Sequence, residues 1–357
     1  MTLAKPSTIR DVAQAAGLST ATVSRYLNKR LVLPAKTAIR VDRAVVALGF
    51  KPNAIARRLS RGTSETLGFV TSDIAHPFFA SIASAAEQEA ARLGYTLAMF
   101  NTRNQLSQEL VFLSRIEDQQ VDGILFLTNH PDDGTLRDKI RQCRQVVLID
   151  EDVPETEVPK VFADSEHGAR LATRHLIEQG HTRIAFVSGP KGMRSSQERF
   201  AGFRQEMSAA RLPVDRSLVK FGEYEEEFGV HAFQALWRVA DPPTAIFATA
   251  DMLAIGVIRG ARQAGLVVPE DLSVIGFADM LHVNLLSPPL TTVRQSTSEF
   301  GRRGVRLLVA KLKGETVSPE PERVPVELVV RGSVGAPARR RKRAAAALRA
   351  SGRPAAE

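Results

Sequence analysis

The stretch TIRDVAQAAGLSTATVSRYLN, residues 8–28, decides how the N-terminal part of the chain folds. Its first half places Ile9, Val12, Ala13 and Ala16 at i, i+3, i+4 and i+7, the spacing of one apolar helix face. Gly17 tolerates a positive φ and therefore predicts the end of that helix and a tight turn. A second short helix follows, so the stretch predicts a helix-turn-helix.

The polar residues of this stretch have two expected uses. Thr8 and Asp11 have the spacing of a capping box, and Ser19 is suited to N-cap the second helix, on which Val23 and Leu27 face inward. The outward face of the second helix then carries short polar or bidentate side chains, which suit base edges and phosphates in a major groove. They are Thr20, Ala21, Ser24, Arg25 and Asn28. A helical hairpin with a merely polar surface is the alternative.

Charge is distributed unevenly along the 357 residues, although the total is only +9. Residues 1–62 carry a balance of +10 and residues 338–357 carry +6, which leaves −7 for the middle of the chain. A basic N-terminal unit on an acidic body indicates a polyanionic partner held at one end.

The composition also excludes several classes of protein. No run approaches 18 consecutive apolar residues, so we expect no membrane span. The first twenty residues lack the apolar run of a signal peptide, which favours the cytoplasm. A single Cys143 excludes an intramolecular disulfide framework and a cysteine-based metal cluster.

Two further helices are expected before residue 63. Ala38, Val41, Val45 and Leu48 recur at helical spacing and complete a three-helix headpiece. Residues 51–62 then combine start signals, a stop glycine and an apolar face formed by Ile55 and Leu59. This short helix could bury its apolar face on its own domain. Alternatively, two copies could pair in a dimer and wedge their leucines into a minor groove.

From Glu65 onward, short β-rich runs alternate with amphipathic helices. This alternation predicts α/β architecture, with parallel sheets that have helices on both faces. About ten such units are too many for one modest sheet, so two similar lobes are expected. Ligand sites in such folds lie at the carboxyl ends of the strands. The expected helices span 78–93, 105–119, 166–179, 195–210, 226–238, 252–264 and 298–313.

The final segment differs from everything before it. It contains five consecutive basic residues, 339–343, followed by alanine-rich sequence without apolar periodicity, and is expected to be disordered. It could add sequence-independent DNA affinity or have no dedicated role. No leucine heptads indicate a tetramerisation coiled coil.

Taken together, these motifs resemble the LacI (lactose repressor) family of bacterial transcription regulators over residues 8–335. The resemblance is carried by IRDVAQAAGLSTATVSRYLN, GFKPNAIARRL, HPFF, LIEQGHTRIAFVSGP, ERFAGF, ADMLAIG, PEDLSVIGF and PPLTTVRQ. It implies an all-α helix-turn-helix headpiece (1–50), a hinge helix (51–62) and a two-lobed core similar to periplasmic binding proteins (63–335), before the tail (336–357). Lobe 1 is expected at about 66–163 and 293–318, and lobe 2 at about 166–290 and 322–335.

The resemblance further implies a homodimer that acts as a repressor on a palindromic operator in double-stranded DNA. A small-molecule effector, a sugar or related metabolite, would bind between the lobes. Thr20, Ala21 and Arg25 match major-groove readers, and Leu59 matches the minor-groove wedge. The full set expected at DNA is Thr8, Ser19, Thr20, Ala21, Thr22, Ser24, Arg25, Asn28, Asn53, Ala56, Arg57 and Leu59.

Cleft positions of the family match seven residues of the core, and Asp279 is a possible addition. These candidate effector residues are Ser72, Phe78, Phe79, Asp150, Arg199, Tyr224, Asp279 and Gln295. Ala250 and Ala278 replace polar residues that usually reach the effector, which indicates a less hydroxylated or an anionic ligand. Structural roles remain open: the Phe pair could belong to the core, Asp150 could cap a turn, and Arg199 could pair with a carboxylate of the other lobe.

Two other function classes compete with a regulator. A solute-binding protein would share the core, but a +10 headpiece argues against it. An enzyme would need a catalytic motif, and neither a Gly-x-Ser-x-Gly elbow nor a phosphate-binding loop nor a His-Glu-x-x-His motif occurs. We therefore expect no catalytic residues, no metal and no cofactor.

Overall fold

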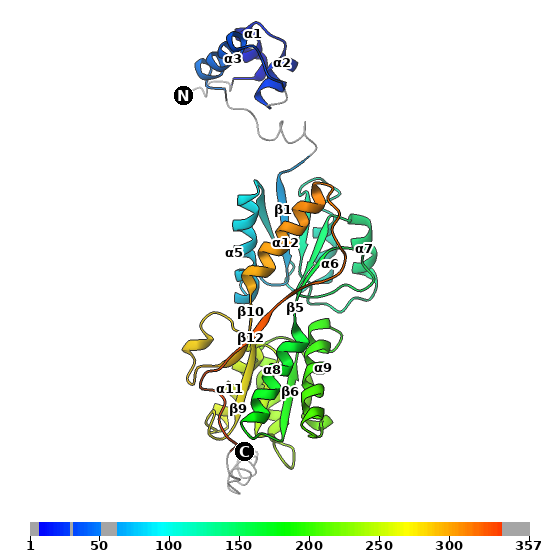
Figure 1. Ribbon diagram of the computed structural model, residues 1–357, viewed down its shortest axis with the longest axis vertical. Helices are drawn as coiled ribbons and strands as arrows, with labels where there is room; N and C mark the ends of the chain where they lie inside the picture. Colours follow the sequence, from blue (N-terminus) through cyan, green and yellow to red (C-terminus); the bar gives the residue numbers. More distant parts are fainter. Residues whose placement is uncertain (1–6, 29–30, 51–62, 338–357) are drawn as a thin grey trace, which may run out of the picture. The chain divides into compact units, whose positions relative to one another are not determined.

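The computed structural model describes residues 7–28, 31–50 and 63–337. The chain divides into two compact units, Met1–Glu65 and Thr66–Glu357. The first unit is helical and the second contains two parallel sheets, so the expected combination of an all-α headpiece with an α/β two-lobed core is confirmed (Figure 1). The expected hinge, 51–62, lies outside the described residues, as does the tail from residue 338.

Three helices build the headpiece: α1 (Ile9–Ala16), α2 (Thr20–Leu27) and α3 (Ala35–Ala47). The predicted signals act as expected. Gly17 ends α1 with φ at +62°, and the Asp11 carboxylate accepts the Thr8 backbone N–H at 2.7 Å. Ser19 Oγ accepts the Thr22 backbone N–H at 3.1 Å. The side chains buried between the helices are Val12, Ala13, Ala16, Val23, Val41 and Ala44.

Lobe 1 is a six-stranded sheet in the order β11-β5-β4-β3-β1-β2, with every neighbouring pair parallel. Its helices cover both faces: α5 and α12 lie on one, and α6 and α7 on the other. The strands are β1 (Thr66–Thr71), β2 (Thr96–Asn101), β3 (Gly123–Phe126), β4 (Val146–Ile149), β5 (Lys160–Ala163) and β11 (Glu322–Val324). The helices are α5 (Pro77–Arg92), α6 (Leu106–Leu113), α7 (Thr135–Cys143) and α12 (Thr297–Leu312).

Lobe 2 repeats this plan with the order β12-β10-β9-β8-β6-β7, in which only the β10–β12 pair is antiparallel. Helices α8 and α9 cover one face, and α10 and α11 the other. The strands are β6 (Ile184–Ser188), β7 (Val219–Phe221), β8 (Ala245–Ala248), β9 (Ser273–Ala278), β10 (Thr291–Gln295) and β12 (Val326–Val329). The helices are α8 (Ser165–Glu178), α9 (Arg194–Ala209), α10 (Glu226–Trp237) and α11 (Asp251–Gln263).

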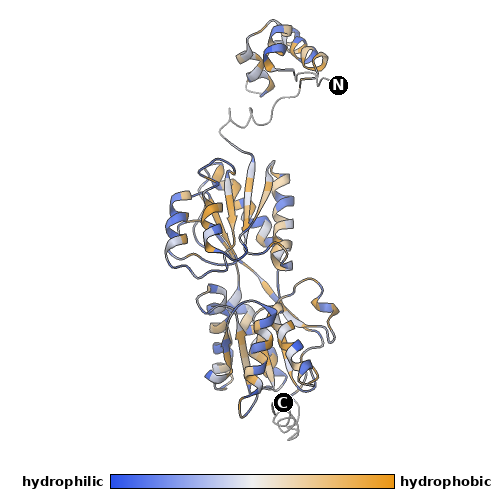
Figure 2. Cartoon of the chain, turned by 180° about the vertical axis from the view of Figure 1, so that it is seen from behind, coloured by the Kyte–Doolittle hydropathy of each residue, from blue (hydrophilic) through white to orange (hydrophobic). Residues whose placement is uncertain are grey.

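Hydrophobic residues, coloured orange, concentrate along the strands between the helical layers (Figure 2). The central strands are buried on both faces, as parallel sheets require. Each lobe therefore has two apolar layers, one on either side of its sheet.

The chain passes between the lobes three times, and two of the expected boundaries shift. Lobe 1 was expected to resume near 293, but β10 stays in the second sheet and the crossing follows Gln295. Lobe 2 was expected to resume near 322, but β11 pairs with β5 in the first sheet. Pro325 separates β11 from β12 because proline has no N–H to donate to a strand ladder. The sequence interpretation also missed β5 and α7, and it made α6 too long.

Glu109 is a buried carboxyl group on α6. The Thr128 hydroxyl donates to its Oε2 at 3.0 Å, and Oε1 has no hydrogen-bond partner among the described residues. Burial raises the pKa of Glu109 from 4.5 to about 8. The folded chain therefore holds this proton more tightly than the unfolded chain does.

Glu109 should make the folded state less stable as pH rises. Since its folded pKa lies above the unfolded one, the free energy of unfolding should fall between pH 4.5 and about 8, by up to about 1.4 kcal/mol per pH unit. Glu109→Gln should flatten that dependence and raise the urea midpoint at pH 8 relative to the parent. Parallel pH profiles of the two proteins in urea unfolding would contradict this assignment.

Candidate DNA-binding surface and effector site

The outward face of α2 is exposed, and the opposite face packs against the rest of the headpiece. Thr20, Ala21 and Arg25 are exposed, whereas Val23 on the opposite face is fully buried. The Tyr26 hydroxyl bonds both carboxylate oxygens of Asp42 on α3 at 3.1 Å. Helix α2 thus presents one accessible guanidinium on a rigid support. This geometry suits insertion of a helix into a major groove.

Several other expected DNA contacts already serve the helices. The hydroxyl of Thr8 donates to Asp11 at 2.8 Å, and the hydroxyls of Ser19 and Thr22 bond each other at 2.8 Å. The Asn28 amide lies 3.5 Å from Ser24 Oγ. The five expected DNA contacts among them are exposed or half-buried, so their polar groups can still face phosphates. These five are Thr8, Ser19, Thr22, Ser24 and Asn28. The other candidates, Asn53, Ala56, Arg57 and Leu59, lie outside the described residues.

The candidate effector residues occupy strand ends and the segments beside them in both lobes. Ser72 follows β1 and Asp150 follows β4, both in lobe 1, while Arg199 lies on α9 and Gln295 ends β10 in lobe 2. Tyr224 lies between β7 and α10. The carboxyl ends of parallel strands, where the sequence analysis expected a ligand, therefore carry most of this set.

Asp150, Arg199 and Gln295 form a buried polar group that spans the lobes. Asp150 Oδ1, Arg199 Nε and Gln295 Nε2 each lack a hydrogen-bond partner within the described part of the chain. Burial raises the pKa of Asp150, and the charges of Arg199 and Arg194 and the side chain of Gln295 oppose that rise. One acceptor and two donors in a shielded place thus lack a well-formed hydrogen bond, although the Gln295 amide already interacts with Asp150. Such orphaned groups are characteristic of a site that takes a polar ligand.

Arg199 is fixed by two contacts within lobe 2. Its NH1 donates to the Thr249 carbonyl at 2.8 Å, and its guanidinium carbon lies 4.0 Å from the centroid of the Phe277 ring. Stacking on an aromatic face orients the planar guanidinium and leaves Nε free. The side chain is therefore held in place before any ligand arrives.

Three residues beside this group were missed by the sequence analysis: Glu151, Ser195 and Ser196. The Tyr224 hydroxyl lies 2.9 Å from both serine hydroxyls, and the Glu151 carboxylate accepts the Ser195 backbone N–H at 3.2 Å and its hydroxyl as well. Burial and the nearby Asp150 charge raise the pKa of Glu151 to about 8. Only its position next to Asp150 could have drawn attention to Glu151.

The remaining candidates have partners of their own. Both oxygens of Asp279 are paired, with Arg294 and Arg331, each at 2.7 Å. Phe78 and Phe79 belong to the lobe 1 core, where Phe78 meets Phe300 edge-on. The Ser72 hydroxyl accepts from the Asn129 amide at 2.9 Å. These contacts favour the structural interpretations left open for the Phe pair, and they leave Asp279 no free carboxylate oxygen.

Ala250 and Ala278 stand where the family usually has polar residues, and Asp251 beside them does not supply a replacement polar group. Ala250 is the N-cap of α11, and Ala278 ends β9 with φ at +126°. The neighbouring Asp251 is fully buried and accepts the Thr292 hydroxyl at 2.6 Å and the Met280 N–H at 2.7 Å. The Asp251 carboxylate is therefore used in bonds to β10 and to the loop after β9. It does not replace the polar side chains that are absent at positions 250 and 278.

Other kinds of site were sought in the described ranges. No cluster of three or more His, Cys, Asp or Glu residues in residues 7–28, 31–50 and 63–337 has the arrangement of a metal site. Within the same ranges, no helix has the length and apolar character needed to span a membrane.

Comparison with known proteins gives a consistent result over about nine-tenths of the chain. Residues 8–53 match the model of bacterial regulatory proteins of the lacI family, and residues 173–334 match a periplasmic binding protein-like domain. The HTH-type transcriptional repressor CytR of Escherichia coli K12 is 35% identical over 331 residues, covering 92% of this chain and 97% of its own length. PurR of Actinobacillus pleuropneumoniae serotype 3, also an HTH-type transcriptional repressor, is 33% identical over 92% of this chain and 98% of its own.

Solved structures agree in fold. A lac repressor dimer bound to operator and the anti-inducer ONPF superposes with a TM-score of 0.81 at 27% identity, covering 93% of this chain and all of that one. A complex of the transcriptional regulator CelR with cellobiose gives 0.71 at 32% identity, with 92% and 99% covered. These relatives are regulators and not enzymes. The chain belongs to the lacI family of bacterial regulatory proteins and is a DNA-binding transcriptional regulator.

Proposed function

We propose that this regulator represses transcription by binding a palindromic operator in double-stranded DNA as a homodimer. The exposed polar face of α2, with Arg25 in its last turn, is the observation that carries this proposal. An α-helix fits into the major groove of DNA, where an arginine guanidinium on its outward face can form two hydrogen bonds with one guanine. The basic balance of residues 1–62 supplies the sequence-independent part of the affinity.

Residues 51–62 connect the headpiece to the core in this proposal. Their predicted helix is too short to be stable alone, so partner and DNA would stabilise it together. Leu59 would wedge into the minor groove at the centre of the operator, with Arg57 against a phosphate and Asn53 and Ala56 near the backbone or the partner hinge. The basic tail would add at most sequence-independent attraction. A regulator of this kind works in the cytoplasm, where its DNA is.

A small molecule bound between the lobes would control operator affinity. The buried acceptor of Asp150 and the buried donors of Arg199 and Gln295 fit a small metabolite that both donates and accepts hydrogen bonds, and the alanines at 250 and 278 favour one with few hydroxyl groups. Because Asp150 and Arg199 belong to different lobes, a ligand that bonds both changes the balance between lobe arrangements. Couplings of this type are typically about 1–3 kcal/mol, which corresponds to about 5- to 150-fold regulation.

A solute-binding function remains the second candidate, since the core alone resembles a binding protein. The DNA-binding headpiece favours a regulator, because a solute-binding protein does not need a recognition helix that carries a basic residue. Binding of a metabolite without any change in operator affinity would favour the alternative.

Arg25→Ala should relax sequence preference at one position in each half of the operator. Loss of a bidentate base contact costs about 1–3 kcal/mol of discrimination at that base pair. Arg43→Ala, which removes the same charge from an exposed position on α3, is the matched control and should leave the preference intact. The preferred sites of the parent, Arg25→Ala and Arg43→Ala are compared by selection from random duplexes. If Arg25→Ala selects the same motif as the parent, Arg25 does not read a base.

Asp150→Asn should impair the response to the effector and spare operator binding in its absence. A hydrogen bond to a charged group contributes about 1.5–3 kcal/mol, so about 10- to 150-fold more metabolite should be needed for the same effect. The matched control is Asp152→Asn, since Asp152 bonds Lys160 at 2.7 Å within lobe 1. Titrations of metabolites against labelled operator measure the shift. Equal titration curves for all three proteins would place the effector elsewhere.

A further inference from the structure

A surface groove of lobe 2 lies beside the second half of α9, and we call it the α9 groove. Its volume is about 740 Å³. One wall is a stripe of α9 with helical spacing, and the other is the loop that follows this helix, residues 211–214. The stripe consists of Ala201, Arg204, Gln205 and Ser208. None of these residues takes part in the contacts proposed for DNA or for the effector.

Two arginines of the α9 groove have no ionic partner. Arg204 and Arg211 are exposed, and neither side chain forms a hydrogen bond or an ion pair with a residue in the ranges that the structure describes. The Arg204 guanidinium carbon lies 5.8 Å from the centroid of the Phe200 ring, which leaves all its N–H groups available. The groove therefore carries two positive charges that nothing in the described chain neutralises.

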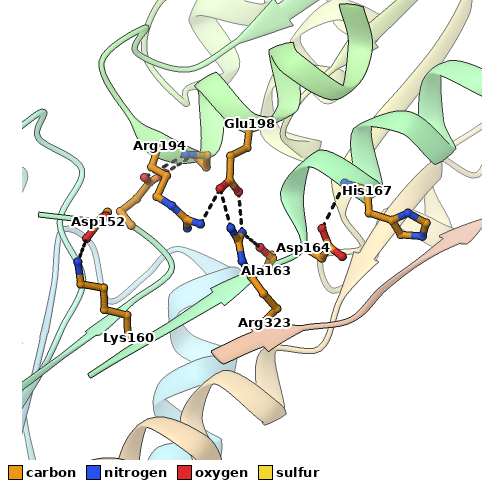
Figure 3. Close-up of polar contacts among 10 residues, drawn as sticks. Asp152, Lys160, Ala163, Asp164, His167, Arg194, Glu198 and Arg323 are labelled. Carbon is orange, nitrogen blue, oxygen red and sulfur yellow. Dashed lines mark hydrogen bonds and ion pairs between the residues drawn. The ribbon is translucent and has the colours of Figure 1, made fainter. Parts of the chain in front are cut away.

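Carboxylates near α9 are already bonded to other arginines. Glu206, two residues after Arg204, accepts from Arg170 at 2.7 Å and from Arg174 at 2.8 Å. Figure 3 shows the same arrangement at the start of the helix, where two arginines converge on Glu198. The free charges of the groove thus differ from the usual pattern along this helix.

Arg211 occupies a backbone position that favours glycine. Its φ is +57°, and the N–H groups of Arg211 and Leu212 bond the carbonyls of Ser208 and Met207 at 2.9 and 2.8 Å, which is a Schellman ending of α9. Five other helices, α3, α5, α8, α11 and α12, have glycine at the same place, one residue after the C-cap. These glycines are Gly49, Gly94, Gly180, Gly265 and Gly314.

An arginine at positive φ makes the folded state less stable than a glycine would. The Arg211 side chain recovers nothing from the helix end, since it bonds none of the last α9 carbonyls in the described structure. A backbone conformation that is held at a cost indicates a use outside the fold. For Arg211 that use is a guanidinium placed beside the groove.

The apolar wall of the α9 groove narrows the choice of ligand. Leu212 and Val214 are half-buried and pack against the apolar layer beneath α8 and α9, and Pro213 between them is exposed. Arginine clusters recognise acidic segments through charge-assisted hydrogen bonds. Apolar side chains next to such a cluster accept an apolar residue of the same segment.

Two other kinds of ligand fit less well. Most lining residues of the groove are exposed, whereas a site for a small metabolite encloses most of its ligand. A DNA duplex would approach residues 63–337, which carry net negative charge and repel a polyanion. An extended acidic peptide avoids both difficulties, because it is narrow and can lie along an open groove.

We propose that the α9 groove docks an acidic segment of a partner protein, with carboxylates on Arg204 and Arg211 and an apolar side chain on Leu212 and Val214. The two arginines are seven positions apart, about 10 Å along the helix axis, which equals about three residues of extended chain. The helix has 16 residues and is about 24 Å long. The groove, at its far end, therefore leaves the candidate effector group at its start accessible.

Selection of short random peptides displayed on phage tests the docking site in the full-length protein. Peptides that also bind the double variant Arg204→Ala, Arg211→Gly, through the basic headpiece for example, are removed by counter-selection. We expect the remaining peptides to be acidic and to contain an apolar residue. Labelled with fluorescein, the most enriched peptide should bind Arg204→Ala and Arg211→Gly each about fivefold more weakly than the parent at low salt.

Arg211→Gly has a second readout that separates docking from a structural role. Since glycine accepts a positive φ, this variant should have a higher urea midpoint than the parent while it binds the peptide less well. Arg238→Ala is the matched control, because it removes an exposed arginine at the end of α10, which covers the opposite face of the same sheet. It should bind the peptide as the parent does.

Three results would overturn the docking site. The first is a selection without acidic peptides, or peptides that bind the parent and both single variants equally. The second is displacement of the peptide by a duplex that lacks the operator, which would assign the groove to nucleic acid. The third is unchanged peptide binding together with a lower urea midpoint for Arg211→Gly, which would assign Arg211 to the stability of the helix end.

Discussion

All three crossings between the lobes leave from the carboxyl ends of strands: Ala163 of β5, Gln295 of β10 and Val324 of β11. This constraint brings the two carboxyl edges together, and the rest of the core depends on it. The strand interiors are mostly apolar and buried, so most of the polar side chains that face the other lobe lie at or beyond the strand ends. Asp150 and Glu151 on one side, and the start of α9 on the other, consequently face each other across the gap.

The contacts across that gap are of a kind suited to regulation. Each lobe has its own apolar layers and would hold together without the other. Between them lie a few hydrogen bonds and ion pairs, each contributing little beyond the cost of desolvating its partners. A ligand with different affinities for two arrangements of the lobes then changes how they are populated.

Most of the architecture could be predicted from the sequence, because helix and strand periods are local properties. The turn at Gly17 and the cap at Ser19 are examples, since each depends on neighbours within three residues. Strand β11 has no separate local signal, because only Pro325 lies between it and β12 in the sequence, and its partner strand β5 lies about 160 residues earlier. The bond between Glu151 and Ser195 joins positions 44 residues apart and has no local signature. Asp279 illustrates the opposite error, since its partners Arg294 and Arg331 become neighbours only in the folded sheet.

In the proposed function, an exposed recognition helix on a paired headpiece reads a two-fold symmetric DNA site under the control of the core. Selection of preferred sites from random duplex DNA by the purified full-length protein is the most direct test. We expect enrichment of one palindrome, with a central step that is easily unstacked, bound by two chains. Binding that depends steeply on salt but favours no sequence, with and without a panel of metabolites, would contradict it.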